Sequence, residues 1–254
     1  VHCLNIAKEI YDNTPRAGVT SKVQTATELY LATGNKDYLD FIFANWDACT
    51  RGISGNGWYL ARIAKELEGN RKYNKYVKSF KEALAGYSVS LAKQSAETPY
   101  GVPYKPSIWG AGWDIQSFGY KHYFLAKEYP EIFSGDQVFN ALNFVLGCHP
   151  GVNGKSFAGG VGTESTIVGY GLNRADWSYI PGGVISGTAL IRPDFPELLT
   201  FPFLWQQVEY VLGGGSSHYM FLVLAAQKLL MPKFEFKKNP EKIYTVKSGN
   251  TVMK

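Results

Sequence analysis

The sequence predicts an all-α fold built from helical hairpins. Three observations support this prediction: apolar residues recur at helical spacing as far as residue 148, short turns separate these segments, and strand-like alternation occurs only in the C-terminal tail. Short links between amphipathic helices make consecutive helices antiparallel. Such hairpins build either an α/α toroid, with inner helices around a central cleft, or an open solenoid. No residue repeat of fixed period occurs, which favours the toroid.

We expect a helix in each segment whose apolar residues would fall on one helical face. Turns are expected at Gly34-Asn35, from Gly52 to Gly57, at Gly69-Asn70 and at Tyr129-Pro130. The last helix is apolar almost all round and should be buried on most of its faces. The expected helices are Cys3–Asp12, Thr20–Thr33, Tyr38–Cys49, Trp58–Leu67, Tyr73–Leu91, Asp114–Tyr129, Asp136–Leu146 and Ser216–Leu230. Trp46 and Trp58 lie on apolar helical faces and are expected in the core.

A glycine-rich stretch with interspersed aromatic residues, Gly147 to Gly215, separates the last two expected helices. A loop of this length in a compact domain is usually functional, and its apolar content argues against disorder. After Pro232, alternation at Phe234 and Phe236 and again at Ile243 and Val246 predicts two short strands. We therefore divide the chain into a helical part, 1–231, and a basic tail, 232–254.

Charge and composition exclude several classes of protein. The net charge is +5, but the tail from Pro232 holds six lysines and two glutamates, so the rest of the chain carries only +1. This distribution excludes a nucleic-acid groove. No apolar run approaches the ~18 residues of a membrane span.

The sequence predicts no bound metal or cofactor. The histidines are far apart, and neither a phosphate-binding P-loop nor a G-x-S-x-G elbow occurs. The three cysteines form no C-x-x-C pair, which argues against zinc. We expect them to be small buried residues, with a Cys49–Cys148 bridge left open.

Glu209 is the acidic residue with the most suggestive surroundings. It is flanked by Trp205, Val208, Tyr210 and Val211 and precedes a triple glycine and the last helix. Apolar surroundings disfavour the charged form of a carboxyl group, which suits a general acid near neutral pH. The alternative is an exposed loop glutamate with no chemical role.

Four segments in order resemble glycoside hydrolase family 9, the inverting cellulases and exo-glycosidases with an (α/α)6 barrel. Ala26–Leu39 is similar to the family pattern A-x-E-L-Y-x-A-T-G-x-x-x-Y-L, and Ile108–Trp113 looks like its W-G-S-N helix entry. Phe144–Pro150, with Ser156-Phe157 and Gly169-Tyr-Gly171, resembles its Y-x-L-G-x-N-P … S-[FY] … G-[FY]-G run. Glu209 then stands where the family's N-E-V-A places the general acid.

The resemblance implies that this chain forms the C-terminal half, or slightly more, of an (α/α)6 toroid. Two departures qualify it. Asn173–Pro181 replaces a His-His-Arg triplet that helps to bind glucan, which argues against ordinary endo-cellulase specificity. The segments Trp205–Tyr210 and Gly213–Gly215 look more like the exo-acting bacterial branch. No Asp-x-x-Asp-Tyr loop, the family's source of the water-activating base, occurs here. We therefore expect Val1 to interrupt a longer protein whose missing N-terminal half supplies the base and is a partner of this chain.

The implied substrate is a β-linked oligosaccharide or polysaccharide, and the implied location is the periplasm or the cell exterior. Aromatic side chains stack on the apolar face of sugar rings, and a loop carboxylate can bind sugar hydroxyls. Asp114 is expected to cap the helix that follows it. The expected substrate-binding residues are Trp109, Trp113, Tyr170, Asp176, Trp177 and Trp205.

Two other functions remain open. A toroid that binds carbohydrate without hydrolysing it would need no base and would bind sugar whether or not Glu209 is intact. A polysaccharide lyase or sugar epimerase on the same scaffold would favour a Tyr/His or Arg pair, which is not identifiable here. With only part of a ring present, we also expect exposed apolar helix faces, and hence association or aggregation of the isolated chain.

Overall fold

The structure is a computed structural model that describes residues 2–14, 17–104, 111–149, 156–162, 165, 181–185, 210–211, 214–231, 246–248 and 251–253. It is predominantly helical, as the sequence predicts. The helices are α1 (His2–Asn13), α2 (Val19–Thr33), α3 (Lys36–Ala44), α4 (Trp46–Arg51), α5 (Ile53–Glu66), α6 (Asn74–Ala96), α7 (Ala111–Glu128), α8 (Asp136–Val145) and α10 (Gly214–Leu230). The strands are β1 (Val184–Ile185), β2 (Tyr210–Val211), β3 (Val246–Ser248) and β4 (Thr251–Met253).

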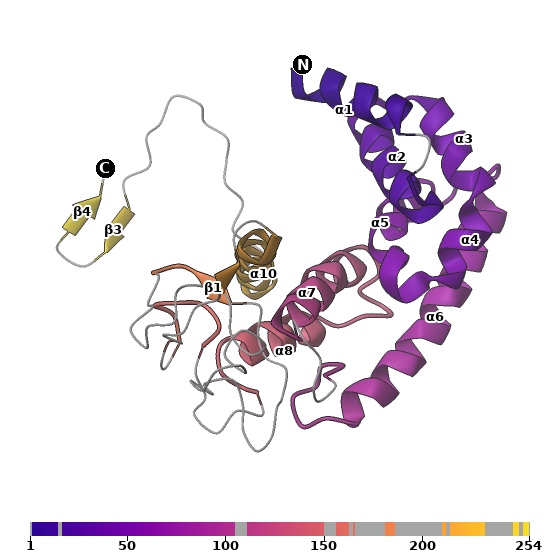
Figure 1. The fold of residues 1–254 in the computed structure, drawn as a ribbon. Coiled ribbons are helices and arrows are strands. Elements are labelled where there is room, and N and C mark those ends of the chain that lie inside the picture. Colours follow the sequence, from indigo (N-terminus) through magenta and orange to yellow (C-terminus); the bar gives the residue numbers. More distant parts are fainter. Residues whose placement is uncertain are drawn as a thin grey trace, which may run out of the picture.

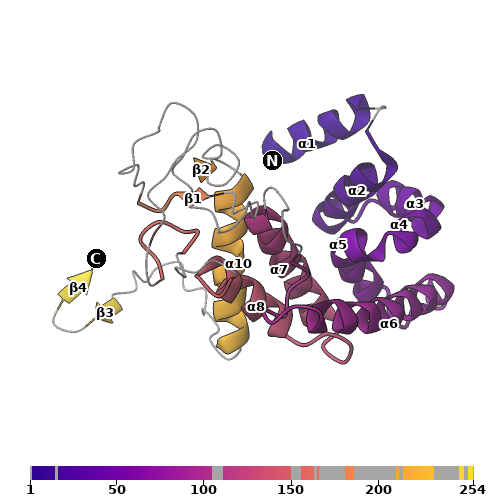
Figure 2. The ribbon, with the colours of Figure 1, turned by 60° about the horizontal axis from the view of Figure 1, so that its bottom comes forward.

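The helices form an open arc with an inner and an outer row (Figure 1). The inner helices are α2, α5, α7 and α10, and each packs against the next. Outer helices cover them: α3 packs on α2, α6 on α5, and α8 on both α7 and α10 (Figure 2). This is the hairpin arrangement of an incomplete α/α toroid. Among the described residues, no helix has the length and apolar character needed to cross a bilayer.

The inner helices run parallel to one another. Between α5 and α7, the rings of Trp58 and Tyr120 lie 5.6 Å apart, and the Lys65 ammonium lies 5.4 Å from the centre of the Tyr129 ring. The contacts thus advance along both helices in the same direction. Between α7 and α10, Tyr120 lies 4.8 Å from His218 and Phe124 lies 5.5 Å from Phe221, again in the same direction. The N-termini of α5, α7 and α10 therefore lie at one end of the arc.

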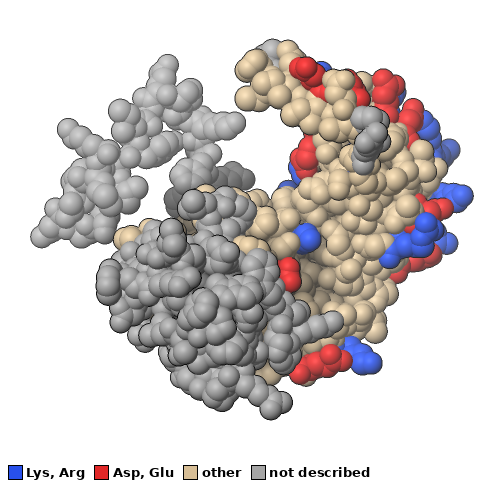
Figure 3. Space-filling view, in the orientation of Figure 1, with Lys and Arg blue, Asp and Glu red and all other residues tan. Residues whose placement is uncertain are grey.

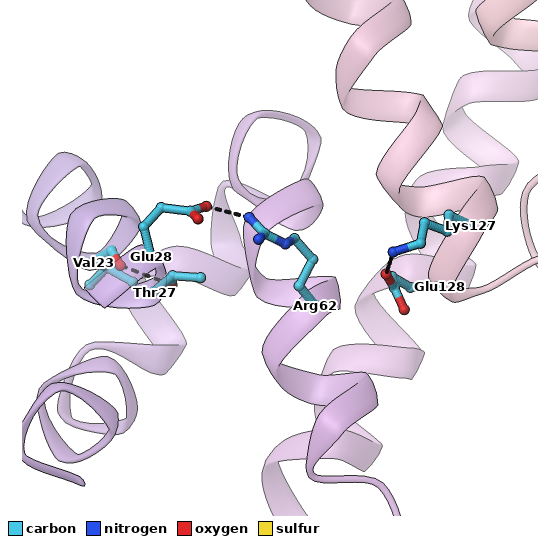
Figure 4. A network of polar contacts seen from close by, with 6 residues as sticks. All are labelled: Val23, Thr27, Glu28, Arg62, Lys127 and Glu128. Atoms are coloured by element: carbon cyan, nitrogen blue, oxygen red, sulfur yellow. Dashed lines mark hydrogen bonds and ion pairs between the residues drawn. The ribbon is translucent and has the colours of Figure 1, made fainter. Parts of the chain in front are cut away.

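Polar contacts reinforce the start of the inner row (Figure 4). Arg62 of α5 forms an ion pair with Glu28 of α2. On the buried side of α2, the Thr27 hydroxyl donates a hydrogen bond of 3.0 Å to the carbonyl oxygen of Val23, so its polarity is satisfied within the helix. Lys127 and Glu128 form a separate pair at 2.9 Å near the end of α7.

Helix boundaries follow local chemistry. Gly34 ends α2 in the left-handed conformation (φ 68°) and donates its N–H to the carbonyl of Tyr30, while the Asn35 side chain accepts from the N–H of Asp37 and caps α3. The prediction of a single helix over Tyr38–Cys49 is wrong, because two helices, α3 and α4, occupy this stretch. The break lies at Asn45, whose side chain donates to the carbonyl of Phe41 at 2.8 Å.

The expected break from Gly52 to Gly57 is also too long, because α5 already begins at Ile53. Two contacts explain how a helix forms through these glycines. The Asn56 side chain donates to the carbonyl of Cys49 and joins the start of α5 to α4. At Gly57, α5 packs against α7: an added Cβ atom would lie 3.6 Å from Leu125, an ordinary van der Waals distance.

The hydrophobic core consists of two clusters. One spans α2 to α7 and includes Trp46 and Trp58, which confirms their expected burial. The other joins α7, α8 and α10, and Phe118 packs against both clusters. The expectation for the cysteines holds only for Cys49, because Cys3 and Cys148 are exposed. All three cysteines are free thiols, so no Cys49–Cys148 bridge forms.

The α10 helix is less buried than its composition predicts. Leu222, Ala225 and Ala226 are buried, whereas Met220 and Leu224 are 60% and 62% exposed. The helix packs on α7 and α8 and also contacts β1 and β2, and these contacts leave Met220 and Leu224 exposed. Charged side chains gather along the outer edge of the arc, whereas few lie on the surface facing its opening (Figure 3). The described part of the chain therefore presents an apolar, unpartnered face at α10, which is the kind of exposure expected of part of a ring.

Gly119 sets the separation of three helices. A Cβ atom there would lie 2.7 Å from both the Cβ of Ala141 in α8 and a methyl group of Leu222 in α10. We expect Gly119→Ala to lower the free energy of unfolding by about 1–3 kcal/mol, because the rigid Ala141 contact forces the helices apart. Gly86→Ala, in α6 with nothing within 4 Å of the added atom, is the matched control and should raise it by about 1 kcal/mol. Chemical denaturation of both variants measures the difference, and equal effects would contradict this account.

The C-terminal tail contains a hairpin in which β3 pairs antiparallel with β4, with Val246 opposite Met253. The prediction of a strand near Val246 is therefore confirmed, whereas its partner β4 was not predicted. The strand expected at Phe234–Phe236 lies outside the described residues.

Candidate functional site

Most of the predicted site residues lie outside the described residues. Of those expected to act in catalysis or substrate binding, only Trp113 is described, half-buried in the first turn of α7. The neighbouring Asp114 is exposed in that turn rather than at the cap, because the helix already begins at Ala111. The predictions outside the described residues concern Trp109, Tyr170, Asp176, Trp177, Trp205 and Glu209.

The chain on the C-terminal side of Glu209 is nevertheless positioned by β2, which begins at Tyr210. In this antiparallel pair, Tyr210 lies opposite Ile185 and Val211 opposite Val184. Both strands contact α10, which begins at Gly214. The segment that follows Glu209 therefore lies at the N-terminal end of an inner helix.

Further backbone contacts tie this strand pair to the helices. The N–H of Phe157 donates to the carbonyl of Val145 at the end of α8 at 2.8 Å. Ala158 then forms a bridge with Val184, and the N–H of Gly159 donates to the carbonyl of Gly183 at 2.8 Å. A continuous path of backbone contacts thus leads from α8 through the glycine-rich region to β1 and β2.

Three residues from the segments singled out in the sequence, Phe144, His149 and Phe157, pack this region onto the core. The buried His149 ring stacks on Phe157 with a centroid separation of 5.0 Å, and Phe144 contacts both rings. Gly162 has φ 86°, and a Cβ atom there would lie 2.9 Å from Ser156 and 3.0 Å from the carbonyl oxygen of Leu146. These residues hold the backbone of the glycine-rich stretch in place. The part of the family 9-like pattern that they form therefore has a structural role.

A separate polar cavity of about 270 Å³ lies between α5, α6 and α7, and we call it the α5–α7 cavity. The sequence alone does not reveal this cavity, because its lining residues come from distant parts of the chain. One signal was present: the polar residues Asp114, Ser117 and Lys121 recur at helical spacing on the apolar α7. The cavity is lined by Ser54, Tyr87, Gln94, Pro103, Asp114, Ser117, Phe118, Lys121 and His122.

A buried histidine lies against this cavity in a fixed tautomer. The Nδ1 of His122 lies 2.7 Å from the carbonyl oxygen of Phe118, which can only accept, so Nδ1 carries the proton. Its Nε2 lies 3.0 Å from the hydroxyl of Tyr87 and accepts from it. Burial lowers the pKa of His122 to about 4, and the nearby charge of Lys121 acts in the same direction. His122 is therefore neutral at neutral pH.

The two charged residues of the cavity have opposite signs. Burial lowers the pKa of Lys121, and the negative charge of Asp114 opposes this effect. Within the described part of the chain, neither side chain forms an ion pair or hydrogen bond with another residue. Both are thus available to a ligand.

Comparison with known proteins identifies the architecture. No family model matches the sequence, and no curated protein is detectably similar to it. Solved structures do match. A Bacteroides ovatus GH9 protein superposes with a TM-score of 0.57 at 15% identity, over 84% of this chain and 40% of its own. The chain shares the fold of family 9 glycoside hydrolases.

Two further family 9 structures agree. An endoglucanase from the termite Nasutitermes takasagoensis gives a TM-score of 0.57 at 16% identity, over 84% of this chain and 52% of its own. The cellulase Cel9M of C. cellulolyticum gives 0.59 at 17% identity, over 90% of this chain and 57% of its own. The chain therefore spans about half the length of the family 9 structures that it matches, and the expected partial (α/α)6 toroid is confirmed.

Proposed function

We propose that this chain is the C-terminal part of the catalytic domain of a family 9 glycoside hydrolase that cleaves β-linked oligosaccharides, with Glu209 as general acid. The observation that carries the proposal is the position of β2. It directly follows Glu209 in the chain and packs at the N-terminus of α10. The N-termini of α5 and α7 lie at the same end of the arc, so a substrate there would meet residues from several inner helices.

The proposed mechanism is inversion. Glu209 protonates the oxygen of the leaving sugar while a carboxylate base, ~6.5–9.5 Å from it, activates a water on the opposite face of the ring. The base is supplied by the part of the protein that completes the toroid. Asp176 binds a sugar hydroxyl, and the aromatic residues Trp109, Trp113, Tyr170, Trp177 and Trp205 are proposed as stacking surfaces.

The mode of cleavage is proposed to be exo, on the resemblance of the segments around Glu209 to the exo-acting branch. Substrates of this class are encountered in the periplasm or outside the cell, and we propose that the protein acts there. Hydrolysis by the full-length protein carrying Glu209→Gln tests the assignment. Loss of turnover is expected, and unchanged turnover would reject Glu209 as the acid.

We also propose that the rest of the toroid covers the apolar face of α10. Met220 and Leu224 are one helical turn apart and exposed on this face. The chain alone is therefore expected to self-associate, and replacing both residues with glutamine should shift it toward monomer in sedimentation velocity. Val89→Gln, at a 73% exposed position on the outer helix α6, is the matched control and should change nothing. A monomeric chain with a cooperative melt would contradict the proposal.

A further inference from the structure

Basic side chains gather at the beginning of the outer helix α6. From Lys65 to Glu82 the sequence holds six basic and three acidic residues, a net charge of +3, whereas residues 1–231 as a whole carry only +1. Lys and Arg side chains lie along this outer edge of the arc, on the side away from its opening (Figure 3). Four exposed residues form what we call the α6 basic patch: Arg71, Lys72, Lys75 and Lys78.

Few acidic side chains neutralise this patch. Among the described residues, none of its four members forms an ion pair. Glu68, the acid that precedes the patch in the chain, is already bound by two other lysines. Asp40 of α3 interacts electrostatically with Lys72. The other three basic side chains therefore have no ion-pair partner in the described part of the chain.

The position of the patch is unfavourable for the helix itself. The α6 helix begins at Asn74 and has no acidic residue in its first turn. The N-terminus of a helix carries a partial positive charge, so nearby cations destabilise it, and Lys75 and Lys78 also repel each other at a spacing of three residues. Helix stability alone would favour acidic residues here. Binding of an anionic surface gives a reason for this concentration of positive charge.

The side chains of the patch favour a flat anionic surface over a protein partner. Protein interfaces depend on a few apolar or aromatic anchors that become buried on binding. Residues 71 to 78 offer no exposed large apolar side chain, because Tyr73 and Val77 belong to the core and Tyr76 packs against it. Long lysine and arginine side chains bind an anionic bilayer through charge instead. Each one near the bilayer surface strengthens binding about fivefold.

We propose that the α6 basic patch holds the protein against the anionic phospholipid surface of a membrane. Contact through α6 places the outer row of helices on the bilayer, and the inner row then faces away from it (Figure 1). The binding is peripheral and electrostatic, so it weakens as the salt concentration rises. It requires neither Glu209 nor a bound sugar.

The test is co-sedimentation of the full-length protein with vesicles made of equal parts of phosphatidylcholine and phosphatidylglycerol. Replacing both Lys75 and Lys78 with glutamine should weaken binding about 25-fold, since each lysine contributes about fivefold. Both side chains are exposed, and Lys75→Gln removes a cation from a helix N-terminus, so the melting temperature should not fall. An unchanged melting temperature separates loss of the membrane contact from unfolding.

Lys93→Gln combined with Lys127→Gln is the matched control, because both lysines are exposed and lie outside the patch. It removes the same charge, and the basic tail is intact in every variant, so binding should change little. Equal losses in the two double variants, or equal binding to vesicles of phosphatidylcholine alone, would overturn the inference. Undiminished vesicle binding by Lys75→Gln/Lys78→Gln would also overturn it and leave an acidic protein as the remaining partner for the patch.

Discussion

Glu209→Gln is expected to reduce hydrolysis of a natural β-linked disaccharide by the full-length protein by about 10²–10⁴-fold, the usual contribution of a general acid. Glutamine preserves the size of the side chain and can still form hydrogen bonds, but it cannot supply the proton that the departing sugar oxygen requires. The loss should appear in kcat/KM, measured with purified protein at constant pH.

The leaving group distinguishes loss of an acid from general damage to the site. A dinitrophenyl glycoside releases a stable anion that needs little protonation, so Glu209→Gln should slow its hydrolysis far less than that of the disaccharide. Glu235→Gln in the basic tail is the control and should affect neither substrate. Equal losses on both substrates would indicate that Glu209 has a structural role instead.

Acidification from pH 6.5 to pH 4 is expected to cost about 3 kcal/mol of stability through His122 alone. Its pKa is 6.5 as an ordinary histidine and about 4 in the fold, because burial disfavours the charged ring. Between these values the unfolded chain binds a proton that the folded chain does not. Stability therefore falls as pH decreases through this interval, and the contribution of His122 is constant below pH 4 and above pH 6.5.

His122→Gln should remove this contribution, so that urea midpoints between pH 4 and pH 6.5 change less with pH than in the unaltered protein. Burial also lowers the pKa of His218, so a smaller dependence of the same sign should remain. Gln24→Ala, at an exposed position of α2, should leave the pH dependence unchanged. An undiminished pH dependence in His122→Gln would contradict the assignment.

Helical periodicity predicted the helices well because most of them bury a continuous apolar stripe. For the same reason it concealed the boundary between α3 and α4. Ile42, Trp46 and Cys49 are all at most 1% exposed, so the buried stripe continues across the break at Asn45. In α10, hydropathy alone could not say which side is covered, since Leu222 and Leu224 are chemically identical but buried and exposed, respectively. That distinction depends on neighbouring helices.

The proposed catalytic residue could be singled out from its apolar neighbours in the sequence, and this prediction still awaits its test. The α5–α7 cavity could not be found in this way, because Ser54, Gln94 and Lys121 converge only when three helices pack together. His122 is a further example. Its distance from other histidines in the sequence argued against zinc, but only the fold reveals its bonds to Tyr87 and Phe118.

The packing of inner helices against their neighbours has a consequence for assembly. The main contacts pass from α2 to α5, from α5 to α7 and from α7 to α10, and Phe118 joins the two hydrophobic clusters. Such a row can grow one hairpin at a time, with each addition stabilised by the hairpin already in place. A cut in the polypeptide between two helices leaves these side-chain contacts in place, so two separate chains can complete one ring. The helix faces at the two ends of the row are then covered when the ring closes, whether the backbone is continuous or cut.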